Sequence, residues 1–303
     1  MSYRIITWSD RLTQILLTPP IAGFDDFICA WVYRGPETFI VETGPSSTAG
    51  ELVAALKEIG LTRPDFILLT HIHIDHAGGI GEIAAAFPGA PVVCHDMARP
   101  HLIDPEKLWQ GTVKTLGDTG RAYGPIRPVP EDRLMSAQEF STGSIRPVLT
   151  PGHAPHHVSF ITADGIVFAG EAGGVCIDFH DTVDYLRPAT PPKFRLETSA
   201  ASIDLLVGES PETICYGHTA VRPGAVARLK KHREQLFFWK ELIAGEIGKA
   251  EGDTLIENCV DRVTQADPLL KGLAFATEPA RQRELYFIRN SIRGYIDYLA
   301  PAK

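Results

Sequence analysis

Apolar and polar positions in the first third of the chain alternate between strand-like and helical spacing, which is typical of a layered α/β domain. Two apolar runs, FICAWVY and TFIVETG, flank the turn sequence RGPE and predict a β-hairpin over residues 27–44. Leu52, Leu56 and Ile59 then recur at helical spacing and predict a helix. The fully apolar segment 66–70 predicts a short buried strand that leads directly into a polar run.

The pattern of strands and helices continues well beyond the first third. A second helix is predicted over 79–87, and residues 96–144 are richer in Pro, Gly and charge, which indicates a mixed helical and loop insertion. Two groups of strands between helices favour an α/β (α+β) domain with two sheets packed face to face. The further strands are predicted at APVVCH, SIRPVLT, HVSFITA, GIVFAG and TICYGH.

The last part of the chain changes to helix only. Apolar side chains recur at helical spacing over 226–247 and again over 285–299. We therefore divide the chain into a domain at 1–223 and a C-terminal helical extension or cap at 224–303. Since apolar stripes of this size are seldom left bare, we expect the extension to pack on the first domain or to form a homodimer with a second subunit.

Four metal-competent side chains stand directly after the strand predicted at 66–70: His71, His73, Asp75 and His76. Alternation sends the first two to one side of an extended chain, while a turn brings Asp75 and His76 to a neighbouring point. Imidazole and carboxylate together suit zinc, iron or manganese, and two adjacent ligand sets favour two ions. A lone histidine is usually an ordinary residue, but this clustering between strand and helix predicts metal binding.

The run HIHIDH is similar to the HxHxDH signature of the metallo-β-lactamase superfamily, and three later motifs agree with that family in order and spacing. The sequence Thr-Pro-Gly precedes His153, where the family has a third histidine for the first metal. A Gly-Glu pair places Glu171 where a carboxylate bridges both ions, and a Gly-His pair places His218 where the second site closes. The resemblance covers about residues 1–222 and implies a four-layer αββα sandwich.

The resemblance also implies a cofactor of two divalent metal ions, with zinc as the first choice and iron or manganese as alternatives. Glu171 departs from the family, whose residue here is normally Asp, and its extra methylene must be accommodated. Asp178 is the weaker alternative ligand, and we expect His156 and His157 to support the ligands by hydrogen bonds. The predicted metal ligands are His71, His73, Asp75, His76, His153, Glu171 and His218.

Within the family, the segment TPGHAPHHVSF looks most like glyoxalase II and related hydrolases of small thioesters, esters or lactones. This resemblance implies a hydrolase that uses a metal-bridging hydroxide, with Asp75 as a catalytic ligand that orients the nucleophile. Two alternatives remain: a mononuclear iron oxygenase resembling persulfide dioxygenases, and a scaffold that binds metal without turnover. Metal identity and stoichiometry would distinguish the three.

The irregular segment after the bridging carboxylate would emerge at the metal-bearing edge of the sheets. Its Tyr185, Arg187 and Thr190 are candidate substrate contacts, and Tyr216 is another. Arg187 would pair with a carboxylate, and either tyrosine would steady a developing oxyanion. The other interpretation is that these residues only fix a Pro-rich loop.

Charge and composition limit the classes of partner that we expect for this protein. A net charge of -8 and a pI near 5.8 provide no basic field for a phosphate backbone, so we expect a small-molecule substrate and no nucleic acid. Five cysteines, mostly in apolar runs, indicate reduced core residues. The sequence has neither a leader-like start nor a run of roughly eighteen apolar residues, so we expect a cytoplasmic protein without membrane contact.

Overall fold

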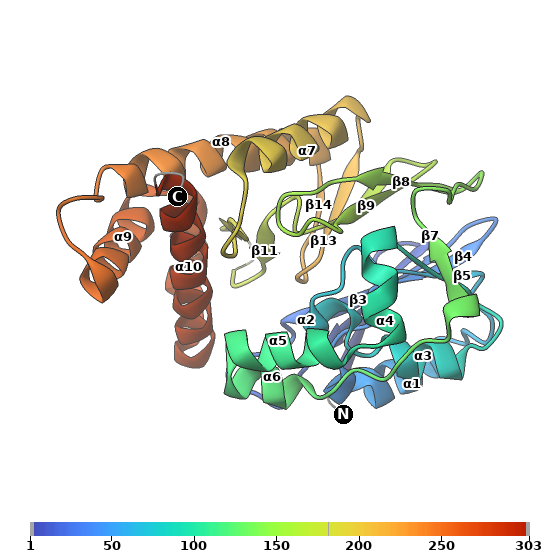
Figure 1. Ribbon diagram of the computed structural model, residues 1–303. Helices are drawn as coiled ribbons and strands as arrows, with labels where there is room; N and C mark the ends of the chain where they lie inside the picture. The colour runs from blue at the N-terminus through green and yellow to red at the C-terminus, as the bar shows by residue number, and fades with distance from the viewer. Residues whose placement is uncertain (1–2, 181, 301–303) are drawn as a thin grey trace.

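The computed structural model describes residues 3–180 and 182–300, in which two β-sheets are enclosed by helices (Figure 1). The first sheet has seven strands in chain order, antiparallel from β1 to β4 and parallel from β4 to β7. The β3–β4 pair confirms the predicted hairpin, whereas β1, β2 and β7 lie where the sequence pattern identified no strand. The strands are β1 (Tyr3–Thr7), β2 (Leu12–Leu17), β3 (Ile28–Arg34), β4 (Thr38–Val41), β5 (Phe66–Leu68), β6 (Val92–Cys94) and β7 (Leu134–Ser136).

The second sheet has five strands in the order β14-β13-β10-β9-β8. Its β10 and β13 are parallel, and its other neighbours are antiparallel. A separate two-stranded ribbon is formed by β11 and β12. The strands are β8 (Ile145–Leu149), β9 (Val158–Thr162), β10 (Ile166–Gly170), β11 (Val175–Ile177), β12 (Tyr185–Arg187), β13 (Thr213–Tyr216) and β14 (Val221–Pro223).

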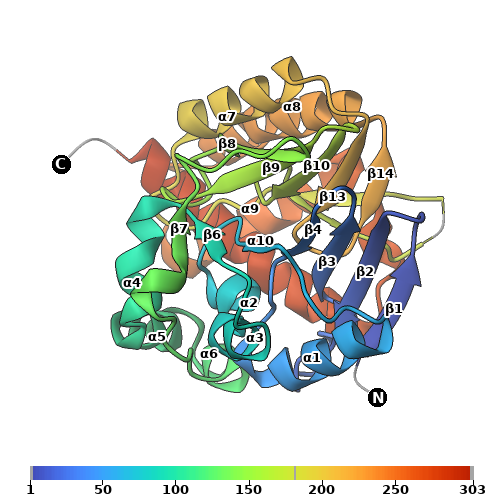
Figure 2. The same cartoon turned by 90° about the vertical axis from the view of Figure 1, so that its right-hand side faces the viewer.

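Helices cover the outer face of each sheet. Figure 2 shows α1 and α3 on the first sheet and α7 and α8 on the second, which confirms the predicted sandwich. The predicted insertion contains α4, α5 and α6. Up to the last strand the helices are α1 (Ala49–Glu58), α2 (Ile74–Ala77), α3 (Ile80–Ala86), α4 (Arg99–Ile103), α5 (Glu106–Leu116), α6 (Asp118–Tyr123) and α7 (Leu196–Gly208), with 3-10 turns η1 (Ser46–Thr48), η2 (Asp96–Ala98) and η3 (Glu131–Arg133).

The alternation of side chains along β3 shows why the two sheets stack. Trp31 and its alternate neighbours point into the core between the sheets, where Trp31 lies 6.3 Å from the ring of Phe168. Ala30 and Val32 point the other way and join the core under the helices. Because both faces of β3 are buried, the strand reads as a continuous apolar run rather than as an alternating one.

The extension packs on the sandwich, which is one of the two arrangements expected from its apolar stripes. Its Trp239 and Tyr295 belong to the same buried cluster as the helix-facing side of the first sheet. The tight approach of α10 is visible at Gly294, where a Cβ would collide with the backbone oxygen of Thr190. None of the described helices is long and apolar enough to cross a membrane. The elements are α8 (Ala225–Ala244), α9 (Gly252–Ala266), η4 (Pro268–Phe275) and α10 (Glu278–Leu299).

Candidate metal centre

The HIHIDH segment leaves β5 and turns directly into α2, and the turn gathers its side chains around one point. His71 and His73 lie in the segment between the strand and the helix, His73 on extended backbone, while Asp75 and His76 lie in α2 itself. A glycine is required next, because a Cβ at Gly78 would collide with a backbone oxygen of α2. Four side chains that are close in sequence thereby reach the same site.

Three loops at the same edge of the sheets supply the other predicted ligands. His153 follows β8, Glu171 follows β10 and His218 follows β13. The register of β10 shifts at its end, where Gly170 adopts a φ of 52° that residues with a side chain rarely tolerate. A Cβ at that position would also collide with the ring of His157. This glycine therefore lets the strand end bend so that the following carboxylate reaches the centre.

The seven predicted ligands fall into two groups, and within each group the ligand atoms lie within 4.8 Å of one another. In the first group, Nδ1 of His73 lies 3.0 Å from Nε2 of His71 and 2.9 Å from Nε2 of His153. The structure thus brings together every metal ligand that the sequence predicts. The first group is His71, His73 and His153, and the second group is Asp75, His76, Glu171 and His218.

Glu171 lies between the two groups and divides its oxygens between them. Its Oε2 lies 3.1 Å from Nε2 of His71 and 3.4 Å from Nε2 of His153. Its Oε1 lies 3.2 Å from Nε2 of His218 and 3.4 Å from Nε2 of His76. One carboxylate that faces both histidine groups has the geometry of a bridging ligand, and the longer side chain of glutamate is accommodated in it.

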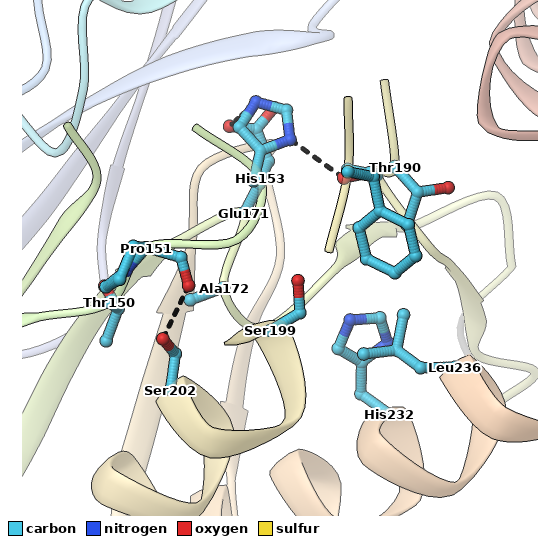
Figure 3. Close-up of a pocket in the computed structure, with 12 residues that line it drawn as sticks. Thr150, Pro151, His153, Glu171, Ala172, Thr190, Ser199, Ser202, His232 and Leu236 are labelled. Carbon is cyan, nitrogen blue, oxygen red and sulfur yellow. Dashed lines mark hydrogen bonds and ion pairs between the residues drawn. The ribbon is translucent and has the colours of Figure 1, made fainter. Parts of the chain in front are cut away.

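Hydrogen bonds on the outer side of the rings fix which nitrogen faces the centre. Nδ1 of His153 donates to the backbone oxygen of Ala189 at 2.9 Å, a bond drawn in Figure 3. Nδ1 of His218 donates in the same way to the backbone oxygen of Phe27 at 3.1 Å. Since neutral imidazole carries one proton, these bonds leave the Nε2 lone pairs directed inward, as metal ligands require.

Among the predicted ligands, two buried atoms lack a hydrogen-bond partner, namely Nε2 of His76 and Oε2 of Glu171. An unsatisfied buried polar atom is costly, so such atoms need another kind of partner. Inward imidazole lone pairs and a carboxylate are the donors that divalent zinc, iron and manganese accept. The residues present therefore fit divalent metal ions.

The charges of the centre agree with this fit. Burial lowers the pKa of His73 to about 4 and that of His71 well below its usual value, so both rings are neutral. Burial by itself would raise the pKa of Glu171, but the surrounding imidazoles hold it well below the usual range. Burial likewise opposes a proton on His76, yet Glu171 and Asp75 raise its pKa to about 10. Metal binding at this ring would therefore displace a proton.

Glu42 is a buried carboxylate of the site that sequence reasoning missed. Its Oε1 accepts a hydrogen bond from the backbone N–H of Thr70 at 3.1 Å, and its Oε2 lies 3.7 Å from Nδ1 of His76. Burial raises the pKa of Glu42 to about 7. Its φ of 65° is unusual for a residue with a side chain and holds the carboxylate behind the ligand ring. The feature of the sequence that could have identified Glu42 as a site residue is its position at the end of the apolar run TFIVETG.

His157 has the supporting role that the sequence predicts. Its Nε2 accepts a hydrogen bond from the backbone N–H of Glu171 at 3.2 Å, and its Nδ1 lies 2.8 Å from Oγ1 of Thr150. The ring is fully buried and fixes the loop that carries the bridging carboxylate. Asp178, the weaker alternative ligand, is paired instead with Arg222.

The candidate substrate contacts divide into two kinds. Arg187 and Thr190 line a cavity that opens over the metal centre, whereas Tyr185 and Tyr216 are buried and do not line it. The hydroxyl of Tyr185 donates to Glu284 at 2.8 Å, and Nε of Arg187 donates to the same carboxylate at 2.6 Å. Both tyrosines therefore have a packing role and not the predicted contact with substrate. The sequence could not show this, because a strand of three or four residues does not reveal which of its sides faces a cavity.

Comparison with known proteins agrees with this geometry. Residues 27–218 match the family model of the Metallo-beta-lactamase superfamily. The metallo-beta-lactamase fold-containing protein ST1585 of Sulfurisphaera tokodaii is 25% identical over 77% of this chain and 87% of its own length. A hydroxyacylglutathione hydrolase of Aliivibrio salmonicida is 31% identical, over 43% of this chain and 53% of its own.

A solved structure extends the likeness beyond the sandwich. The metallo-beta-lactamase family protein TTHA1429 of Thermus thermophilus superposes with a TM-score of 0.64 at 20% identity. The alignment covers 97% of this chain and 94% of that protein, so it includes most of the helical extension. The two proteins therefore share the fold of both parts.

Proposed function

This chain belongs to the metallo-beta-lactamase superfamily, and on that premise we propose that it is a metal-dependent hydrolase of a small thioester, ester or lactone. The observation that carries the proposal is the Glu171 carboxylate, whose two oxygens face two separate histidine groups. Two divalent ions, with zinc as the first choice, would be held by those groups. The similarity to a hydroxyacylglutathione hydrolase supports a thioester as the substrate.

The side chains of the centre have distinct tasks in this proposal. Bound divalent ions would make a water more acidic and polarise an acyl oxygen. The side chain of Asp75 is 16% exposed, against 6% for Glu171, so Asp75 is the carboxylate better placed to hold a proton of the attacking water. His71 and His76 are buried and act only as ligands.

Metal analysis followed by a substrate panel tests the proposal. Protein stripped of metal and resupplied separately with zinc, iron or manganese should approach two ions per chain. The loaded protein should hydrolyse at least one member of a panel of thioesters, esters and lactones, while a phosphodiester serves as the negative control. One iron per chain with oxygen uptake would favour the oxygenase, and firmly bound metal with no turnover would favour the scaffold.

A further inference from the structure

A cavity of about 720 Å³ opens directly over the metal centre. Its floor contains Asp75 and Glu171, and residues of α5 and α10 form its two walls. This volume lies within the range of roughly 300–1,000 Å³ that small-molecule sites occupy. The cavity is thus large enough to hold much more than the reacting group.

Most of the surface between the two walls is apolar. Leu108 and Leu116 project into the cavity from α5, and Phe287 projects from α10. Phe27 and Ile72 extend this surface to the metal centre. No residue of α5 is fully buried: its Leu108 and Leu116 pack against the edge of the core and also line the cavity. An apolar ligand would cover them and gain the free energy of leaving water.

The negative and positive groups that line the cavity lie in different parts of it. Its carboxylates are Asp75 and Glu171, both of which belong to the metal centre. Arg187 is already paired with a buried carboxylate at 2.6 Å. Lys107 on α5 and Arg293 on α10 are both exposed and form no ion pair in the described part of the chain, while Arg293 donates to Asn290 at 3.0 Å and its charge also acts on Glu257 of α9. The two walls therefore each present one exposed positive charge to the cavity.

We propose that this cavity selects an anionic acyl thioester or ester with a long apolar acyl group. The scissile carbonyl lies over the metal centre, the acyl chain lies between Leu108 and Phe287, and the anionic group of the leaving part lies near Lys107 and Arg293. Water adds to the acyl carbon and the C–S or C–O bond breaks. The acyl part leaves as a carboxylic acid, and the other part takes up a proton as a thiol or alcohol. This inference rests on the proposed hydrolase function.

Equilibrium binding separates this inference from catalysis. The ligands are S-octyl and S-ethyl 3-mercaptopropanoate, thioethers that cannot be hydrolysed, and a neutral S-octyl thioether alcohol of equal length. Calorimetry on metal-loaded protein should give at least about tenfold tighter binding for octyl than for ethyl, because six more methylenes leave water. The octyl anion should also bind several-fold more tightly than the neutral octyl alcohol. Equal binding of all three would overturn the inference.

Matched substitutions identify the residues responsible for the preference for a long chain and for the preference for an anion. Leu108→Ala should reduce the octyl preference, whereas Leu205→Ala, at a 55% exposed leucine on α7, should leave it unchanged. Replacing Lys107 and Arg293 together by Met should abolish the preference for the anion, whereas Lys114→Met on the same helix α5 should not. Unchanged preferences in the cavity variants would place the ligand elsewhere and overturn the assignment.

Turnover distinguishes failure of the inference from failure of the proposed function. Octanoyl and acetyl thioesters of 3-mercaptopropanoate should differ at least about tenfold in kcat/KM in favour of octanoyl. Equal hydrolysis of both would leave a hydrolase without acyl selectivity, so only the inference would fall. Selective binding of the octyl thioether without hydrolysis of any panel member would instead count against the hydrolase and keep the cavity assignment.

Discussion

The two ligand groups of the metal centre differ in what holds their histidines in place. In the first group, His71 is held by the neighbouring Thr70, 3.0 Å away, and His153 by the loop oxygen of Ala189. In the second group, the outer nitrogen of His218 is held by Phe27, a residue 191 positions earlier in the chain. The first group thus reaches the extension through the loop at Ala189, whose neighbour Thr190 hydrogen-bonds to Ser291 of α10, while the second group reaches it through the distant segment at Phe27.

That distant segment is in turn covered by the helical extension. The ring of Phe27 stacks on His218 with centroids 4.3 Å apart, and the guanidinium of Arg283 lies 3.9 Å from the centre of the Phe27 ring. Arg283 also donates to the backbone of Gly23 and pairs with Glu284 at 2.8 Å. The comparison teaches that α10 supports the two ligand groups at different points, Ser291 beside the first and Arg283 beside the second, so a change at Arg283 should affect the second ion first.

Removing the extension is expected to have the largest effect. A chain that ends at Arg222 would expose the apolar surface now covered by α8 and α10, because both parts share one buried cluster. We expect aggregation or, in any soluble fraction, weaker binding of both ions, because the loop at Thr190 and the ring of Phe27 would both lose their contacts with α10. Size-exclusion chromatography with elemental analysis of the eluted protein measures both. A soluble monomer that keeps two ions and full activity would make the extension an independent module and break the comparison.

Asp75→Asn tests the chemistry of the second group more than its support. The change keeps the size of a residue that is partly exposed in the cavity but removes its negative charge. Activity on the preferred thioester should fall by about 100-fold or more, while the thermal unfolding midpoint changes little. Asp178→Asn, at an exposed carboxylate paired with Arg222, is the matched control. Activity equal to that of the parent protein would remove Asp75 from the mechanism.

The ligands were predictable because each follows a strand end and stands in a short motif that local backbone geometry imposes. Apart from His157, the supports were not predictable, since Phe27 meets His218 only through the fold, and Glu42 reaches its ligand through an unusual φ. The strands β1 and β2 were not predicted either, because they too depend on contacts that form only in the fold. Their apolar residues are interrupted by polar side chains such as Gln14, which is buried because its amide donates to the backbone oxygen of Thr219 in a distant segment.

The Glu171 series tests whether one carboxylate joins the two groups. Glu171→Asp draws the carboxylate back by one methylene, which exceeds the tolerance of about 0.2 Å for metal ligands. We therefore expect the second ion to bind roughly tenfold more weakly in this variant, although aspartate is the commoner residue of the family, and more weakly still in Glu171→Gln. Metal titration followed by elemental analysis measures each affinity. Equal affinity for both ions in all three proteins would show that Glu171 is not a ligand.

Arg283→Met should have the smallest effect and is the most direct test of the difference between the two groups. Methionine keeps the apolar contact with Phe27 but removes the cation and the bond to Gly23, so the ring that supports His218 loses part of its own support. Loss of such an outer support lowers metal affinity by about tenfold, and here the loss should fall on the second ion alone. Stepwise titration of the metal-free protein with cobalt, followed by its visible absorption, reports the two ions separately.

The control for this last prediction lies on the same helix. Arg289 pairs with Glu257 at the surface at 2.6 Å, so Arg289→Met removes an arginine of α10 without touching Phe27 and should leave both affinities unchanged. Arg283→Lys keeps a cation beside the ring and should recover part of the loss if the contact itself matters. Because Arg283 is buried, thermal unfolding must be measured in parallel. A folded Arg283→Met protein that binds both ions like the parent, or loses both equally, would show that the extension does not act through His218.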